Sequence, residues 1–186
     1  MKKFFASILM AAMFFISSTA LAAHEETIPE GADLSIVQNL AVASPQHFKT
    51  EMTEPTIDEF AAILSNAARI SKQVHVVTYD DMVENIWRDV KVDIKALHDE
   101  NSKKIYFDNV GKYADAYVTA TSANNNKYTQ FFFEVRNAKS GEMLYLLTTQ
   151  SRYYSKDLKG YTKACEDFYK NFDAAVQKAV KKAKKK

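Results

Sequence analysis

The stretch covering residues 115–154 constrains the fold of this chain more than any other part of the sequence. It contains three runs of β-branched and aromatic residues, which begin near Ala116, Tyr128 and Met143. An Asn-rich break separates the first two runs, and a turn containing Gly141 separates the last two. Such runs with turn residues between them are typical of an antiparallel β-meander. A sheet of this kind needs helices to cover at least one of its faces.

Successive side chains of a strand point to opposite faces, so Phe131 and Phe132 face different sides of the predicted sheet. The register of the third run can follow either of two patterns. A turn with an even number of residues places Leu146 on the face of Phe131. A three-residue turn with a bulge places Tyr145 there instead, and both patterns suit the sequence.

Periodic apolar residues before and after the meander predict helices. The sequence Thr56-Ile57-Asp58-Glu59 forms a capping box, and the apolar residues after it recur at spacings of three and four up to Lys72. Gly111 is expected to end a later helix in the left-handed conformation. The predicted elements are strands at 34–43 and 74–77, and helices at 56–72, 78–87, 93–109 and from 161 into the lysine-rich end.

Together these elements predict the α+β fold class. The expected architecture is a two-layer sandwich, in which a mixed sheet ends in a three-stranded antiparallel meander and carries helices on one face. The expected order of elements is β-α-β-α-(α)-β-β-β-α. The other face of the sheet is expected to stay partly open.

The amino-terminal residues have the pattern of a secretory signal peptide. Lys2 and Lys3 precede the apolar run 4–16, and Ala20-Leu21-Ala22 is a small-residue cleavage site. The apolar run falls short of the roughly 20 residues that a membrane-spanning helix needs, and an uncleaved anchor is the alternative. We expect export to the periplasm, with secretion as the alternative. The expected division is a signal peptide at 1–22, a flexible leader at 23–33, a single α/β domain at 34–180 and a lysine-rich tail at 181–186.

Positive charge is concentrated at the two ends of the chain. The sequence has 25 Lys and Arg against 23 Asp and Glu, and two of the lysines belong to the predicted signal peptide. Six more lysines lie within the last nine residues, so the body between the ends has a net charge of −6. An exported acidic domain of this kind does not favour binding to nucleic acid.

The lysine-rich tail allows two further interpretations. Clustered lysines are attracted to an anionic membrane surface, and cations also suit the carboxyl-terminal end of a solvated helix. The tail residues are Lys181, Lys182, Lys184, Lys185 and Lys186.

The sequence contains no G-x-S-x-G motif, no phosphate-binding loop and no dinucleotide-binding glycine pattern. Its four histidines are scattered, and none has metal-ligand spacing to a cysteine or another histidine. These observations argue against an enzyme and predict neither a cofactor nor a metal. The alternative hypothesis is a small hydrolase or ligand-binding protein, in which His47 or His98 acts as a general base in a cleft between helices and sheet.

Three other features have both a structural and a functional interpretation. His24 could bind copper near a processed amino terminus, but it also suits an unstructured leader. Asp80-Asp81 could hold a divalent cation, but acidic residues also stabilise the amino terminus of a helix. Cys165 is the single cysteine and forms no intrachain disulfide, which leaves a buried thiol, a reactive thiol or a link between two chains.

The open face of the predicted sheet supplies the candidate binding residues. They are Tyr117, Tyr128, Phe132 and, in one of the two registers, Tyr145. Aromatic residues on an exposed sheet are frequent anchors of protein–protein interfaces. The alternative is that the leader or a long loop of the same chain covers them.

Several motifs in this order resemble a known type of envelope domain. They are Leu40-Ala41-Val42-Ala43, Val74-His75-Val76-Val77-Thr78-Tyr79-Asp80, Lys112-Tyr113-Ala114-Asp115-Ala116-Tyr117-Val118 and Lys139-Ser140-Gly141-Glu142. Across residues 35–178 the sequence resembles the α/β domain of exported bacterial proteins of the TolB amino-terminal and CsgG-like type. The lipid-bearing cysteine and the membrane-inserting hairpins of CsgG have no counterpart in this sequence. The resemblance therefore does not imply that this chain forms a pore.

The resemblance implies a periplasmic module that binds other envelope components. We therefore expect a non-catalytic envelope protein that binds, or assembles with, a protein partner through the open face or its edge. Weak contact with an anionic membrane surface through the lysine-rich tail is a further expectation.

Overall fold

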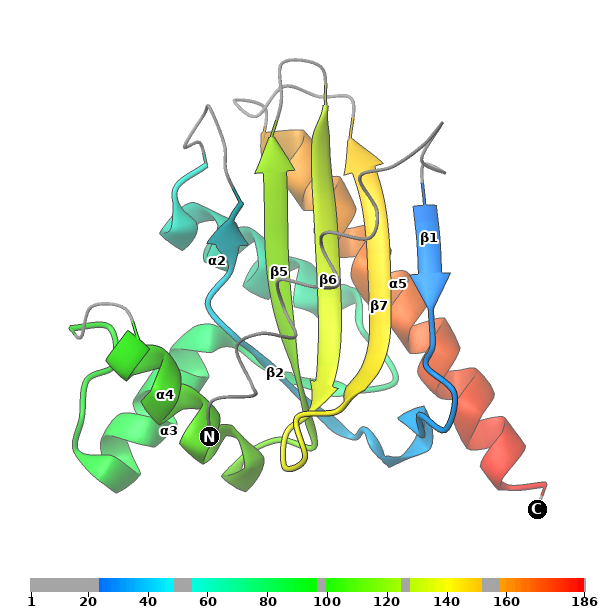
Figure 1. Ribbon diagram of the computed structural model, residues 1–186, viewed down its shortest axis with the longest axis horizontal. Coiled ribbons are helices and arrows are strands. Elements are labelled where there is room, and N and C mark those ends of the chain that lie inside the picture. Colours follow the sequence, from blue (N-terminus) through cyan, green and yellow to red (C-terminus); the bar gives the residue numbers. More distant parts are fainter. Residues whose placement is uncertain (1–23, 49–54, 97–99, 125–127, 152–157, 186) are drawn as a thin grey trace.

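The computed structural model describes residues 24–48, 55–96, 100–124, 128–151 and 158–185. The predicted signal peptide, His98 and Lys186 lie outside the described residues. A seven-stranded mixed sheet has the strand order β1-β7-β6-β5-β2-β4, with β3 paired to β5 beside this path (Figure 1). The α+β class and the predicted order of elements are confirmed, and β1 and β3 are additional strands.

The strands are β1 His24–Thr27, β2 Asn39–Val42, β3 Gln46–His47, β4 His75–Val77, β5 Ala116–Asn124, β6 Thr129–Asn137 and β7 Met143–Ser151. The helices are α2 Ile57–Ala67, α3 Tyr79–Val90, α4 Glu100–Asn109 and α5 Leu158–Ala183. Short 3₁₀ helices are η1 Leu34–Ile36, η2 Ala68–Ile70 and η3 Val110–Lys112. β2 pairs in parallel with β4 and β5, and β5, β6 and β7 form the predicted antiparallel meander.

A register shift between β6 and β7 decides which residues of β7 are covered. Val135 lies opposite Tyr145 and Arg136 opposite Met143, so Leu144 is an extra residue of β7. This bulge turns Tyr145 toward the helices and buries it completely. The bulged register is therefore adopted, and the interpretation of Tyr145 as an open-face residue is wrong.

α2 and α5 cover one face of the sheet (Figure 1). Phe168 of α5 stacks on Phe133 with the ring centroids 4.9 Å apart, and Phe60 of α2 contacts Phe131 edge-on at 6.3 Å. Complete burial of such a side chain contributes roughly 1.5–3 kcal/mol, because apolar area is removed from water. This layer is the larger core of the domain.

α3 and α4 pack on the other face, at the parallel end of the sheet (Figure 1). Neighbouring residues of β2 show this arrangement, since Val42 joins the core beneath α5 while Ala41 joins a second cluster with Met82 and Ile86 of α3. The prediction that the helices lie on one face therefore holds for α2 and α5 and is wrong for α3 and α4. The second cluster contains no residue of β6 or β7, so among the described residues the helices leave the antiparallel part of that face uncovered.

Local interactions set the helix ends and turns. The predicted capping box is confirmed, because Glu59 accepts a 2.8 Å hydrogen bond from the Thr56 N–H and its own N–H donates to the Thr56 hydroxyl. Gly141 has the expected positive φ of 73°. Gly111 does not, so the predicted left-handed helix end is wrong. An added Cβ at Gly111 would lie 3.1 Å from the carbonyl oxygen of Ala138, so close packing explains this glycine.

The expectation of a flexible leader is wrong for its first residues. His24–Thr27 form the edge strand β1, which pairs antiparallel with β7 and places Thr27 opposite Leu146. The polar side chains gave no strand signal because this pairing uses backbone N–H and C=O groups that every such residue carries.

Candidate functional site

The side of the meander opposite α5 is the candidate binding surface, and we call it the open face. All of its residues are partly exposed. It consists of Tyr117, Thr119 and Thr121 of β5, Gln130, Phe132, Glu134 and Arg136 of β6, and Leu146 and Thr148 of β7.

The strand register gives the open face a small apolar centre. Phe132 lies between Thr121 and Thr148 on the neighbouring strands, and Leu146 is diagonal to it. Diagonal neighbours across antiparallel strands are about 7–8 Å apart, within reach of an aromatic ring. An apolar centre with hydroxyl groups around it suits a flat contact with another protein.

A charged pair borders this apolar centre. The carboxylate of Glu134 contacts the guanidinium of Arg136, and the two side chains are 15% and 18% exposed. Arg136 also donates a 2.7 Å hydrogen bond from Nη1 to the carbonyl oxygen of Gly141. These contacts hold both side chains against the sheet, so the surface beside Phe132 is preorganised.

The structure separates the four predicted binding residues. Phe132 lies at the centre of the open face, and Tyr128 is a partly exposed residue immediately before β6. Tyr117 lies at the margin, where its ring contacts Phe107 of α4 at a centroid distance of 5.0 Å, and burial raises the pKa of its hydroxyl. Tyr145 lies in the opposite core. Sequence alternation identified Phe132 but missed Leu146, which only the bulge turns outward.

His47, the predicted general base, takes part in a polar cluster between β3, β5 and α5. Its Nδ1 lies 2.7 Å from the hydroxyl oxygen of Ser122, and its Nε2 lies 2.7 Å from the carbonyl oxygen of Pro55. The hydroxyl of Tyr161 donates to Ser122 at 3.3 Å and accepts from the Asn124 amide at 3.1 Å. The residues around His47 come from separate elements, so no sequence motif indicates them.

In the described part of the chain, this cluster does not assemble the arrangement that the hydrolase hypothesis requires. A general base needs a nucleophile and an orienting acidic group within hydrogen-bond reach. Among the described residues, His47 has a hydroxyl and a backbone carbonyl as its partners, and Ser122 is completely buried. The hydrogen bonds of this cluster instead connect β3 and the residue Pro55 before α2 to β5 and α5.

A groove runs along the carboxyl ends of β2 and β4. It consists of two adjoining hollows of about 400 and 440 Å³, which share Ser44, Tyr79 and Ser102. Tyr106 lines the first hollow and is buried, and its hydroxyl has no hydrogen-bond partner among the described residues. In open α/β sheets, ligands commonly bind outside the carboxyl ends of parallel strands.

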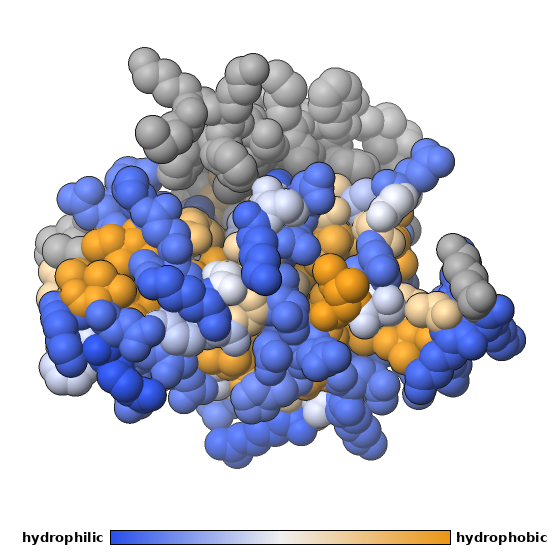
Figure 2. Space-filling model, turned by 90° about the horizontal axis from the view of Figure 1, so that it is seen from below, coloured by the Kyte–Doolittle hydropathy of each residue, from blue (hydrophilic) through white to orange (hydrophobic). Residues whose placement is uncertain are grey.

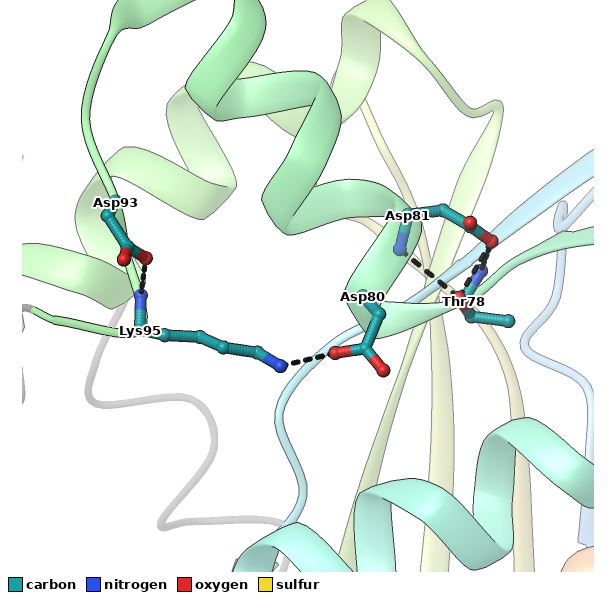
Figure 3. A network of polar contacts seen from close by, with 5 residues as sticks. All are labelled: Thr78, Asp80, Asp81, Asp93 and Lys95. Carbon is teal, nitrogen blue, oxygen red and sulfur yellow. Dashed lines mark hydrogen bonds and ion pairs between the residues drawn. The ribbon is translucent and has the colours of Figure 1, made fainter.

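The Asp80-Asp81 pair has structural roles at the start of α3. Figure 3 shows the Lys95 side chain reaching Asp80, while Asp81 turns toward Thr78. Asp81 accepts a 3.0 Å hydrogen bond from the Thr78 N–H and completes a second capping box. The hydrogen bond to Asp80 raises the pKa of Lys95. Within the described ranges, no group of three or more acidic, histidine or cysteine residues could hold a metal ion.

Cys165 lies inside the core between α5 and the sheet, and it is completely buried. Burial raises the pKa of its thiol, so the reactive thiolate is disfavoured in the folded chain. This position favours the interpretation of a buried packing residue.

Comparison with known proteins finds similarity in chain trace but not in sequence. No protein-family model matches the chain, and no curated protein matches it. Among solved structures, the LpoB carboxyl-terminal domain from Salmonella enterica is 14% identical with a TM-score of 0.49, covering 67% of this chain and 87% of that one. A PelC dodecamer from Paraburkholderia phytofirmans is 11% identical with a TM-score of 0.48, covering 81% and 96%.

A third similar structure is lipoprotein GNA1162 from Neisseria meningitidis, which is 17% identical with a TM-score of 0.37 and covers 72% of this chain and 96% of its own. At these identities and TM-scores, no partner, residue role or family membership is transferred to this chain. The resemblance to the TolB and CsgG-like type stays unconfirmed.

Proposed function

We propose that this chain is a non-catalytic, exported binding module of the cell envelope that holds a protein partner on its open face. The observation that carries the proposal is the unequal covering of the meander. α2 and α5 bury one face, whereas Phe132 and Leu146 stay partly exposed on the other. The predicted signal peptide supports export, and the periplasm is the proposed location.

The partner that suits this surface is a protein with a flat apolar patch bordered by hydrogen-bonding groups. Phe132 would supply the anchor, because a few aromatic residues at the centre of an interface usually carry most of its binding energy. The surrounding threonines would exclude water and hydrogen-bond at the rim.

Site-specific photo-crosslinking in the producing cell tests this proposal. A benzoylphenylalanine at position 132 should crosslink one envelope protein, while the same residue at position 87 should not. Trp87 is a matched control, because it is an aromatic residue that is 52% exposed on α3, outside the open face. With the crosslinked protein purified, Phe132→Glu should weaken its binding at least tenfold and Trp87→Glu should leave it unchanged. Equal crosslinking at both positions would contradict the proposal.

The second candidate function is binding of a small ligand in the groove at the ends of β2 and β4. The buried Tyr106 hydroxyl beside this groove favours it, since buried polar groups normally have a partner. Native mass spectrometry of the exported protein tests this function. A retained small molecule that is lost in Tyr79→Ala would support it, and an unliganded mass in both proteins would count against it.

A further inference from the structure

α5 ends beyond the edge of the sheet (Figure 1). Its last turn and the residues after it carry exposed lysines. Lys178, Lys181, Lys182 and Lys185 recur at helical spacings of three and four, so they lie along one side of the helix. The opposite side of the same turns packs inward through Ala179 and Val180. We call Lys178, Lys181, Lys182, Lys184 and Lys185 the lysine end.

The positive charge of the lysine end is not compensated by ion pairs. Lysines elsewhere do pair with acidic residues, as in Lys104 with Asp108 at 2.5 Å and Lys163 with Asp167 at 3.4 Å. Among the described residues, no ion pair involves the lysine end. These side chains are therefore available to an external anion.

Two exposed isoleucines lie in the segment from β1 to η1, and η1 contacts α5. η1 packs against α5, and its Ile36 is 46% exposed, while Ile28, just after β1, is 45% exposed. Figure 2 shows apolar surface beside hydrophilic surface at the end of the molecule where α5 terminates. Isolated exposed isoleucines are common, but exposed apolar side chains near a cationic helix end would form an amphipathic surface.

We propose that the lysine end, together with Ile28 and Ile36, is a contact surface for the anionic headgroups of a lipid bilayer. The lysines provide attraction to the surface charge, and the isoleucines enter the boundary between headgroups and acyl chains. The apolar part favours lipid over nucleic acid, whose phosphate backbone is bound by cationic and polar groups. No helix in the described part of the chain is long and apolar enough to cross a membrane.

Co-sedimentation of the processed, exported protein with lipid vesicles tests this proposal. Binding is expected to vesicles of phosphatidylglycerol mixed with phosphatidylcholine, and not to pure phosphatidylcholine. Raising the salt to about 1 M shortens the Debye length to about 3 Å and should release the protein. Each lysine near an anionic surface strengthens binding about fivefold, so neutralising four of them should weaken it on the order of 10²- to 10³-fold.

A variant with the same change in charge provides the control. Lys181, Lys182, Lys184 and Lys185 are changed to Gln in the test variant, whereas the control changes the ion-paired lysines to Gln. The control residues are Lys103, Lys104, Lys163 and Lys170. Loss of vesicle binding in the test variant alone supports the proposal. Equal loss in both variants, or no binding to anionic vesicles, would overturn it.

A second variant separates a lipid surface from other polyanions. Ile28→Ser with Ile36→Ser should weaken vesicle binding severalfold and leave binding to a DNA duplex unchanged. If vesicle binding is insensitive to this change, or DNA binds as tightly as the vesicles, the surface is a general polyanion site and the proposal fails. Circular dichroism confirms that each variant is folded.

Discussion

The carboxylate of Asp173 on α5 accepts a 2.7 Å hydrogen bond from the hydroxyl of Ser71, which lies 102 residues earlier in the chain. The same carboxylate accepts hydrogen bonds from the backbone N–H groups of Lys72 at 2.5 Å and Gln73 at 3.3 Å. The Asp173 side chain thus connects the turn before β4 to the last helix through three hydrogen bonds.

Asp173→Ala should lower the free energy of unfolding by about 2–3 kcal/mol, because it removes several hydrogen bonds to a charged acceptor. Urea denaturation measures this loss. Asp167→Ala is the control on the same helix, since it removes only a partly exposed ion pair with Lys163 and should cost about 0.5 kcal/mol. Similar losses in the two variants would show that the Asp173 contacts do not stabilise the fold.

Tyr161→Phe and Tyr169→Phe should affect the free energy of unfolding differently, although each removes one buried hydroxyl. The Tyr161 hydroxyl is hydrogen-bonded to Ser122 and Asn124, so its removal should cost about 1–2 kcal/mol. The Tyr169 hydroxyl has no partner among the described residues, so its removal should leave stability unchanged or raise it by about 1 kcal/mol. Thermal unfolding distinguishes the two, and a destabilised Tyr169→Phe would contradict the assigned environment.

Phe132→Ala and Phe133→Ala test which face of the meander is covered. Phe133 is completely buried against Phe168, so its truncation should cost about 3–5 kcal/mol. Phe132 is partly exposed, so the same change should cost only about 1 kcal/mol. Denaturant titration of both proteins measures the difference in stability. A larger loss for Phe132→Ala than for Phe133→Ala would mean that the helices cover the face of Phe132.

Stability should fall in alkaline solution, partly because of Cys165. Burial raises the pKa of its thiol above the ordinary value of 9.0, so the unfolded chain loses this proton at a lower pH than the folded chain. The contribution to stability is therefore complete below about pH 9 and declines as the pH rises, by about 1.4 kcal/mol per pH unit.

Cys165→Ala should show a shallower decline above pH 9 when stability is measured by urea titration at several pH values. Its stability at neutral pH falls as well, so the slope, and not the absolute value, is compared. Reaction with a thiol reagent provides an independent measurement. The native thiol should react far more slowly than the thiol in urea, and equal rates would contradict its burial.

Local sequence signals predicted the parts of the fold that local interactions decide. The Thr56 and Glu59 capping box depends on residues three positions apart, and the alternation through Phe131, Phe132 and Phe133 depends on strand geometry. For the same reason the alternation alone identifies Phe132 as a candidate contact residue.

Other parts of the site depend on contacts between distant segments. The partners His47 and Ser122 are 75 residues apart, and the β1 strand forms because β7 offers an unpaired edge. The bulge that buries Tyr145 turns Leu146 outward, and nothing in the flanking sequence distinguishes it from the even turn.

The three-stranded meander, the helices around it and the cationic end of the chain can be predicted from local patterns, because periodicity, caps and charge are local properties. Tertiary contacts set which side of the meander is covered, where α3 and α4 pack and which of the described lysines lack acidic partners. Those outcomes depend on contacts between segments that lie far apart in the sequence. Such contacts form only when the whole domain packs.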